Sequence, residues 1–467
     1  MSERSVGLSK KKLFLFGFSA IGVNLMNLVL GVYLCDALLT AGFETNIENW
    51  TYLGKDVVNA SLWAIFITIS KVLDGVIDIP FASFLDNLRS KFGRRRAGIL
   101  AGFVPMLFAF VMFLVPAFKN NLIISTIWFG AFLMLFYCSY TCAMLAYYAC
   151  FSEITSNDQE RNFLSNVKSV ADVVYFVVGF ALMPILVNFM NIRYIVLIFS
   201  PLALLMMAVM FILKEDSGIA TKRSAKKKKN APPQMEDEPK RVGLIKSFAY
   251  TCKNKAFMRW MIVMVPMVFG IQMFLTGQNV FLSGVGQFTG GQIAMINACA
   301  FGPVPATMAL YNYIIRKKGF RFGFVYAMLT FTLGMAVCAL INVNVIHDAS
   351  SRLIGGMGGG LLCSFGIGTF FAVTYFIPSH VAAREKAEKG HTQPSMYFAI
   401  QGLVSAVATA VATGVVWVNV KTHGYTHLLT VVVGVFLLIS CMATVILPKS
   451  ISHIGKAESA ADKATLP

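Results

Sequence analysis

Twelve long apolar runs divide this sequence, and they constrain its fold more than any other feature. Each is about as long as the roughly 20 apolar residues that an α-helix needs to cross the hydrocarbon core of a bilayer. We place them at residues 13–40, 58–86, 97–117, 122–150, 163–190, 193–213, 257–283, 290–315, 322–345, 352–380, 395–420 and 426–447. The pattern therefore predicts an all-α membrane protein with twelve transmembrane helices.

The composition excludes the soluble classes of protein. Hydrophobic residues make up 57% of the chain and charged residues only 13%, whereas soluble domains carry about 25% charged residues. A soluble enzyme, a coiled coil and a disordered scaffold are therefore excluded. The sequence also has no recognisable nucleophile–base pair, zinc signature or phosphate loop, so we expect no enzymatic activity.

The basic residues follow the topology of a membrane protein. Counted with Lys168, 34 of the 40 Lys and Arg residues fall in the N-terminal segment, the even-numbered loops and the C-terminal tail. Five fall in the odd-numbered loops, and the last, Lys71, lies within a run. This asymmetry places both termini in the cytoplasm. The net charge of +18 thus reports topology, and we expect no nucleic-acid partner.

The longest polar gap, residues 214–256, follows the sixth run and contains the lysines Lys226–Lys229. We interpret it as a basic cytoplasmic linker between an N-terminal half, residues 1–213, and a C-terminal half, residues 257–447, which a tail at 448–467 follows. Two six-helix halves are the layout of the major facilitator fold. An unrelated twelve-helix transporter is the alternative.

Ionisable side chains are costly inside a bilayer, so each one is a candidate functional residue. They lie in the N-terminal half: Lys71, Asp74 and Asp78 in the second run, and Lys168 and Asp172 in the fifth. The central parts of the C-terminal runs carry no Asp, Glu, Lys or Arg. Ion coupling through charged groups would therefore reside in the N-terminal half.

The offsets of three and four residues place Lys71, Asp74 and Asp78 on one helical face. Two carboxylates and one ammonium leave a net charge of −1, which a hard cation with oxygen ligands or a proton on one carboxyl would neutralise. A structural salt bridge from Lys71 is the alternative, and it leaves the second aspartate unexplained. We expect a Na⁺ or H⁺ site at Asp74 and Asp78.

Two further charged groups have two interpretations each. Lys168 and Asp172 form either a plain ion pair or, for the deeper Asp172, a contact with a solute or a gate. The polar segment after the second run, with Asp86, Arg89 and Arg94, fixes topology or acts as a gate whose ion pairs open and close.

These residues resemble a known family. Asp74-x-x-x-Asp78-x-Pro80, followed by Asp86-Asn87-x-Arg89-Ser90-Lys91-Phe92-Gly93-Arg94, is similar to the glycoside–pentoside–hexuronide:cation symporters, the melibiose-permease-like branch of the major facilitator superfamily. The segments Glu153–Leu164 and Glu388–Gly402 are also similar to loops of that family.

The resemblance implies roles for individual residues. Asp74 and Asp78 fall on the family's cation-site carboxylates, Lys71 on a basic residue just before them, and Thr141 on a cation-site hydroxyl. Arg161 lies in the second similar segment, and we group it with Asp86, Arg89 and Arg94 as candidate gating residues.

The solute positions depart from the family. Two carboxylates that hold sugar hydroxyls in the melibiose-type permeases correspond to Asn24 and Met144, and a lysine of the eleventh helix corresponds to Ala406. Tyr140 is kept, and Tyr148 replaces an expected Trp. Lys168 falls on, or one residue from, a basic residue of the family's fifth helix. The neutral candidates for lining a cavity, or for interhelical hydrogen bonds, are Asn24, Asn27, Gln272, Gln278, Asn279, Asn297, Tyr375 and Gln401.

The sequence thus predicts a secondary transporter that couples a Na⁺ or H⁺ to symport of a small organic solute by alternating access. By resemblance the solute is sugar- or glycoside-like. An apolar or amphipathic solute is the alternative, and a non-transporting membrane sensor is a third hypothesis. We expect the partners to be the solute, a monovalent cation and the lipid bilayer, with no cofactor beyond the coupling ion. A monomer in the plasma (inner) membrane is expected.

Overall fold

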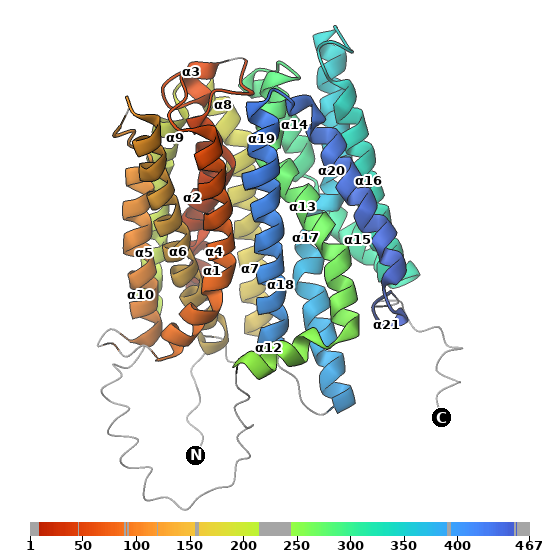
Figure 1. Ribbon diagram of the computed structural model, residues 1–467. Coiled ribbons are helices and arrows are strands. Elements are labelled where there is room, and N and C mark those ends of the chain that lie inside the picture. The colour runs from red at the N-terminus through yellow and green to blue at the C-terminus, as the bar shows by residue number, and fades with distance from the viewer. Residues whose placement is uncertain are drawn as a thin grey trace, which may run out of the picture. The chain divides into compact units, whose positions relative to one another are not determined.

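A computed structural model describes residues 9–44, 46–87, 90, 93–118, 120–154, 158–213, 244–389, 394–452 and 454 (Figure 1). Within these residues, twelve helical spans are long and apolar enough to cross a membrane. They run from Lys10–Leu38 to Thr426–Ile446 and coincide with the twelve predicted runs. The predicted all-α membrane fold is therefore confirmed.

The chain forms two compact units. Unit 1 contains Met1–Leu39, Glu48–Gly179 and Met190–Val242, and unit 2 contains Thr40–Ile47, Phe180–Phe189 and Gly243–Pro467. The helices before the long polar gap are α1 (Lys10–Ser19), α2 (Ile21–Val29), η1 (Leu30–Leu34), η2 (Asp36–Leu38), α3 (Ile47–Trp50), α4 (Ala60–Asn87), α5 (Arg94–Phe113), α6 (Leu122–Ile154), α7 (Asp158–Val177), η3 (Val178–Leu182), α8 (Met183–Val187), α9 (Ile192–Phe199), η4 (Ser200–Met207) and α10 (Ala208–Ile212).

Small residues allow the helices of unit 1 to approach closely. A Cβ on Gly102 of α5 would lie 2.4 Å from the Ala143 nitrogen and 2.5 Å from the Ser139 carbonyl oxygen of α6. A Cβ on Gly22 of α2 would lie 2.2 Å from the carbonyl oxygen of Leu202. Small residues at helix crossings are typical of membrane proteins, so these glycines set how the helices that carry the site are packed.

The helices after the gap are α12 (Leu244–Cys252), α13 (Lys255–Gly284), α14 (Gly290–Phe301), α15 (Val304–Lys318), α16 (Phe320–Leu340), α17 (Ala349–Lys389), α18 (Pro394–Thr409), η5 (Ala410–Trp417), α19 (Val418–Thr422), η6 (Thr426–Leu428), α20 (Leu429–Ala443), η7 (Thr444–Ile446) and α21 (Lys449–Ser452). Local sequence fixes several of their ends. The side chain of Asn254 accepts hydrogen bonds from the backbone N–H groups of Ala256 and Phe257 and caps α13. The Ser351 side chain and backbone N–H hydrogen-bond Asp348 before α17 and lower the pKa of its carboxyl.

Unit 2 also takes in two short segments from the first part of the sequence. The Phe180 ring stacks on the Phe301 ring with centroids 4.1 Å apart, and the Gly290 N–H donates to Asn188 Oδ1 at 3.2 Å. The Lys421 ammonium lies 4.6 Å from the centroid of the Phe43 ring. The compact units therefore do not follow the predicted division of the chain into residues 1–213 and 257–447.

The predicted linker is only partly described. Residues 214–243 lie outside the described part of the chain. The remainder of the expected linker contains α12, and α13 begins at Lys255. Sequence reasoning did not predict α12, because a helix of nine residues leaves too few apolar positions to show a period.

Candidate functional site

The carboxylate cluster of unit 1 is built by α4 and α6. Lys71, Asp74 and Asp78 follow one another at offsets of three and four residues along α4. From α6, Thr141 Oγ1 donates a 2.5 Å hydrogen bond to Asp74 Oδ1. Asp78 is half-buried, and within the described structure its carboxylate has no hydrogen-bond or ion-pair partner. The cluster therefore joins a held carboxylate to one that is available to a ligand.

Lys71 is directed to a tyrosine rather than to an aspartate. Its Nζ donates to the Tyr137 hydroxyl at 2.6 Å and lies 4.0 Å from the centroid of that ring. Among the described residues, no ion pair joins Lys71 to Asp74 or Asp78. The structure thus lacks the salt bridge that the alternative interpretation of this helix required.

A glycine leaves room for this arrangement. A Cβ on Gly31 of η1 would lie 3.2 Å from the Tyr137 hydroxyl oxygen and 3.8 Å from Lys71 Nζ. Sequence reasoning missed both Gly31 and Tyr137. Tyr137 precedes Thr141 by four residues and so shares its face of α6, which is the signal that could have identified it.

The donor set of this cluster suits a hard monovalent cation. Two carboxylates and a hydroxyl offer oxygen ligands, which such cations prefer, and the ammonium of Lys71 is engaged elsewhere. The described residues contain no group of three or more His, Cys, Asp or Glu side chains suited to a metal ion. Asp74, Asp78 and Thr141 are therefore the residues that would hold a coupling ion.

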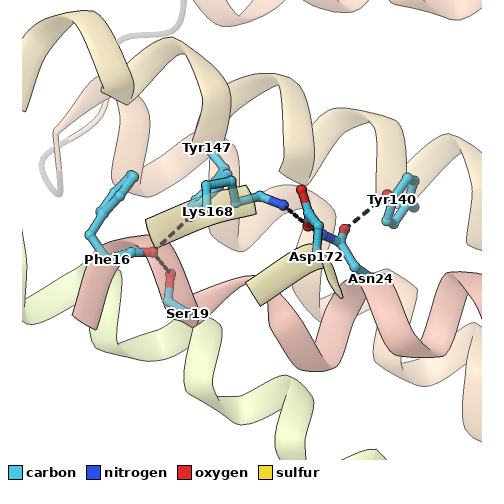
Figure 2. Close-up of polar contacts among 7 residues, drawn as sticks. All are labelled: Phe16, Ser19, Asn24, Tyr140, Tyr147, Lys168 and Asp172. Carbon is cyan, nitrogen blue, oxygen red and sulfur yellow. Dashed lines mark hydrogen bonds and ion pairs between the residues drawn. The ribbon is translucent and has the colours of Figure 1, made fainter. Parts of the chain in front are cut away.

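A second polar cluster joins three helices of unit 1, and Figure 2 shows its members in a row. The Tyr140 hydroxyl of α6 donates to Asn24 Oδ1 at 3.1 Å. Asn24 Nδ2 of α2 donates to Asp172 Oδ1 of α7 at 3.4 Å, and Lys168 Nζ forms an ion pair with the same oxygen. Four residues that the sequence singled out for solute binding thus form one network.

Burial differs across this second cluster. Asn24 is 5% exposed and Lys168 is 7% exposed, whereas the side chain of Asp172 is 39% exposed. The buried cation is therefore neutralised from one side, and the carboxylate keeps accessible surface. A carboxylate in this state can accept hydrogen bonds from hydroxyl or ammonium groups of a ligand.

Backbone contacts hold the helix that carries Asn24. The Phe16 carbonyl oxygen of α1 accepts hydrogen bonds from the Tyr147 hydroxyl of α6 and the Ser19 hydroxyl, both at 2.7 Å (Figure 2). The Phe16 and Tyr147 rings are stacked with centroids 4.7 Å apart. These contacts fix α1 against α6 and so help to position Asn24 one helix further along the chain.

The polar candidates of unit 2 are used mainly within that unit. Gln401 Oε1 accepts from the Trp260 indole N–H at 3.0 Å, and Gln401 Nε2 donates to the Thr374 carbonyl oxygen. Asn297 Nδ2 donates to the Phe180 carbonyl oxygen at 2.7 Å and to Asn279 Oδ1 at 2.9 Å. Interhelical hydrogen bonding accounts for both side chains.

Three polar atoms nearby are buried without a hydrogen-bond partner: Gln278 Nε2, Asn297 Oδ1 and Thr430 Oγ1. Their residues line a cavity of about 20 Å³ inside unit 2. A cavity of more than about 10–15 Å³ with polar walls can hold one water. The cavity is therefore too small for an organic solute.

The remaining predicted residues fall into two groups. Asn27 Oδ1 is buried without a partner, Met144 is buried, Gln272 is half-buried, and Tyr148 is 48% exposed. Other predictions lie outside the described part of the chain: Arg89 entirely, and the side chains of Asp86, Arg94, Arg161 and Tyr375.

Comparison with known proteins gives the family. The sequence pattern of the family described as MFS/sugar transport protein matches residues 15–448, nearly the whole chain. The chain belongs to this family. It is an MFS-type transporter and an integral, multi-pass membrane protein.

Other relatives of this MFS transporter are more distant. Over 116 residues, 24% of the chain, it is 30% identical to an uncharacterized symporter of Synechocystis sp., and the match spans 21% of that protein. Two crystal structures of POT family transporters, one in complex with a thioalcohol-conjugated peptide and one with 5-aminolevulinic acid, have a TM-score of 0.60. Each covers 94% of this chain and 96% of its own, at 12% and 13% identity, which is a likeness of fold.

Proposed function

We propose that this MFS transporter couples the entry of a cation, Na⁺ or H⁺, to symport of a small organic solute by alternating access. The carrying observation is the carboxylate cluster of unit 1. Asp78 lies without a partner one turn from Asp74, while the nearby Lys71 ammonium binds a tyrosine hydroxyl. An uncompensated carboxylate inside a membrane is costly unless a ligand neutralises it.

The second polar cluster is the proposed solute site. Asn24, Tyr140 and Asp172 would offer a solute an amide, a phenol and a half-exposed carboxylate. These groups suit hydroxyl-bearing or amine-bearing solutes, because the carboxylate accepts hydrogen bonds from both. Lys168 supports the site by neutralising Asp172 from its buried side.

Helix α6 is the proposed physical link between ion and solute. Tyr137 and Thr141 contact the carboxylate cluster, and Tyr140, between them, contacts Asn24. A cation that draws on the Thr141 hydroxyl would therefore act on the same helical turn that positions Tyr140. Coupling of this kind is reciprocal, so a bound solute would also tighten cation binding.

Transport by purified protein in proteoliposomes tests the proposal. Asp78→Asn should abolish stimulation of solute uptake by an inward Na⁺ or pH gradient, while solute exchange at equal concentrations continues. Asp348→Asn is the matched control, since it removes one acidic charge outside the spans and Asn can still cap α17. An Asp78→Asn protein with full cation stimulation would overturn the proposal.

An amphipathic solute is the second candidate, and the distribution of polar groups favours it. The predicted polar contacts in unit 2 are mostly used by Trp260, Phe180 and Thr374 within that unit, whereas unit 1 keeps an accessible polar cluster. A solute with one polar end would need no more than this.

A binding screen separates the two kinds of solute. Thermal stability is measured with methyl galactoside, nitrophenyl galactoside and decyl phosphocholine, each with and without Na⁺ at two pH values. Stabilisation by both galactosides alike supports a sugar, because the two share the polar group. Stabilisation only by the probes with an apolar part supports the amphipath.

A further inference from the structure

A basic pocket lies at the end of unit 2 where α12, α13, α17 and α21 meet. Its volume is about 310 Å³, and its walls include Lys253, Lys255, His380 and Arg384. Pockets that bind small ligands have volumes of about 300–1,000 Å³. The carboxylate cluster and the Asn24–Asp172 network belong to unit 1, so this pocket is separate from both.

The charges around the pocket are mainly positive. Lys253, Lys255 and Arg384 are exposed, and the described structure gives the two lysine ammonium groups no ion-pair partner. Glu385 also lines the pocket, but it is only 3% exposed and accepts a 2.7 Å hydrogen bond from the Tyr397 hydroxyl. The one carboxylate is therefore turned toward the protein, and the cations face the opening.

The pocket is held in shape by hydrogen bonds. Asn254 Nδ2 donates to the Tyr397 hydroxyl at 2.8 Å, which in turn donates to Glu385. Asn254 Oδ1 accepts from the Ala256 and Phe257 backbone N–H groups and fixes the N-terminus of α13 beside the pocket. The positive end of this helix adds to the field of the side chains. The cations thus surround a preformed cavity.

We propose that this pocket binds a phosphate-bearing anion, either an anionic lipid headgroup or a soluble phosphate ester. A guanidinium and two ammonium groups around a concave site are the donors that phosphate oxygens prefer. The distribution of Lys and Arg along the sequence predicts that this end of the helices faces the cytoplasm, where basic pockets beside membrane helices bind anionic headgroups. Phe248 of the adjoining α12 is 38% exposed, which suits a helix that lies at the lipid surface. This site does not depend on the proposed symport.

Binding by the purified full-length chain tests the proposal. The probes are inorganic phosphate, soluble inositol trisphosphate, and vesicles of phosphatidylcholine with or without a phosphatidylinositol phosphate. The pocket variant is Lys253→Gln/Lys255→Gln/Arg384→Gln. The matched control, Arg316→Gln/Lys317→Gln/Lys318→Gln, removes three exposed cations from the C-terminal end of α15, outside the pocket. The melting temperature of each variant verifies its folding.

We expect the pocket variant to bind the phosphorylated probes about tenfold more weakly than the wild-type chain, and the control variant to keep its affinity. Loss of binding to both vesicles and soluble probes supports a phosphate site that free phosphate esters can fill. Loss confined to vesicles supports a lipid headgroup. Equal affinity of the pocket variant and the wild type, or an equal loss in the control, overturns the proposal.

Discussion

Replacing Thr141 by Val removes the hydroxyl that donates to Asp74 and leaves the shape of the side chain almost unchanged. The residue is 6% exposed, and its Oγ1 lies 2.5 Å from Asp74 Oδ1. In the proposed cation site the hydroxyl both orients the carboxylate and supplies an oxygen ligand. The substitution therefore tests the ligand set without removing a charge.

The size of the effect follows from the bond that is lost. A hydrogen bond to a charged group contributes about 1.5–3 kcal/mol, and about 1.4 kcal/mol corresponds to a tenfold change in an equilibrium constant. Thr141→Val should therefore raise the half-saturating Na⁺ concentration at least about tenfold. If the coupling ion is a proton, the effect has the opposite sign, because a carboxylate that loses a hydrogen-bond donor binds a proton more tightly.

The assay is a Na⁺ titration of melting temperature for the purified chain, with choline chloride keeping the ionic strength constant, and a parallel pH titration without Na⁺. Thr68→Val is the matched control, since the Thr68 hydroxyl donates only to the Ala64 carbonyl of its own helix. A Thr141→Val protein that matched the control in both titrations would refute the ligand role of Thr141.

Three further outcomes follow. Tyr137→Phe removes the hydrogen-bond acceptor of Lys71, so the ammonium should turn to the carboxylates and compete with the cation, and the Na⁺ titration should show several-fold weaker binding. Asp172→Asn should weaken solute binding about tenfold, as expected for a lost bond to a charged group, and leave the Na⁺ titration of the solute-free chain unchanged. Gly102→Ala should destabilise the protein by about 1–3 kcal/mol, because the added Cβ meets backbone atoms of α6. Gly358→Ala, where a Cβ meets nothing within 4 Å, should leave the melting temperature unchanged or higher.

The fold and the charged residues were accessible from sequence because each depends on local pattern. An apolar run long enough to span a bilayer has few alternatives to a helix, and the spacing of Lys71, Asp74 and Asp78 places them on one face of α4. The contact between Thr141 and Asp74 had been expected only through the family resemblance, and the structure brings the two residues together.

Partners that come from other helices were not accessible. Nothing near Lys71 in the sequence indicates that its ammonium binds Tyr137, a residue 66 positions away. Gln401 and Asn297 were candidates for lining a cavity, but the packing of unit 2 uses them for hydrogen bonds to Trp260 and Phe180. A polar residue in an apolar helix has the same sequence signature in either role, and only the fold decides between them.

Direct measurement of cation binding to the purified, solute-free chain tests the central claim. Na⁺ binding is followed by calorimetry, and proton binding by potentiometric titration, for the wild type and for Asp78→Asn. The account predicts saturable binding of Na⁺, or a proton-binding step, that is present in the wild type and missing from the variant. Identical Na⁺ and proton titrations for the two proteins would contradict it.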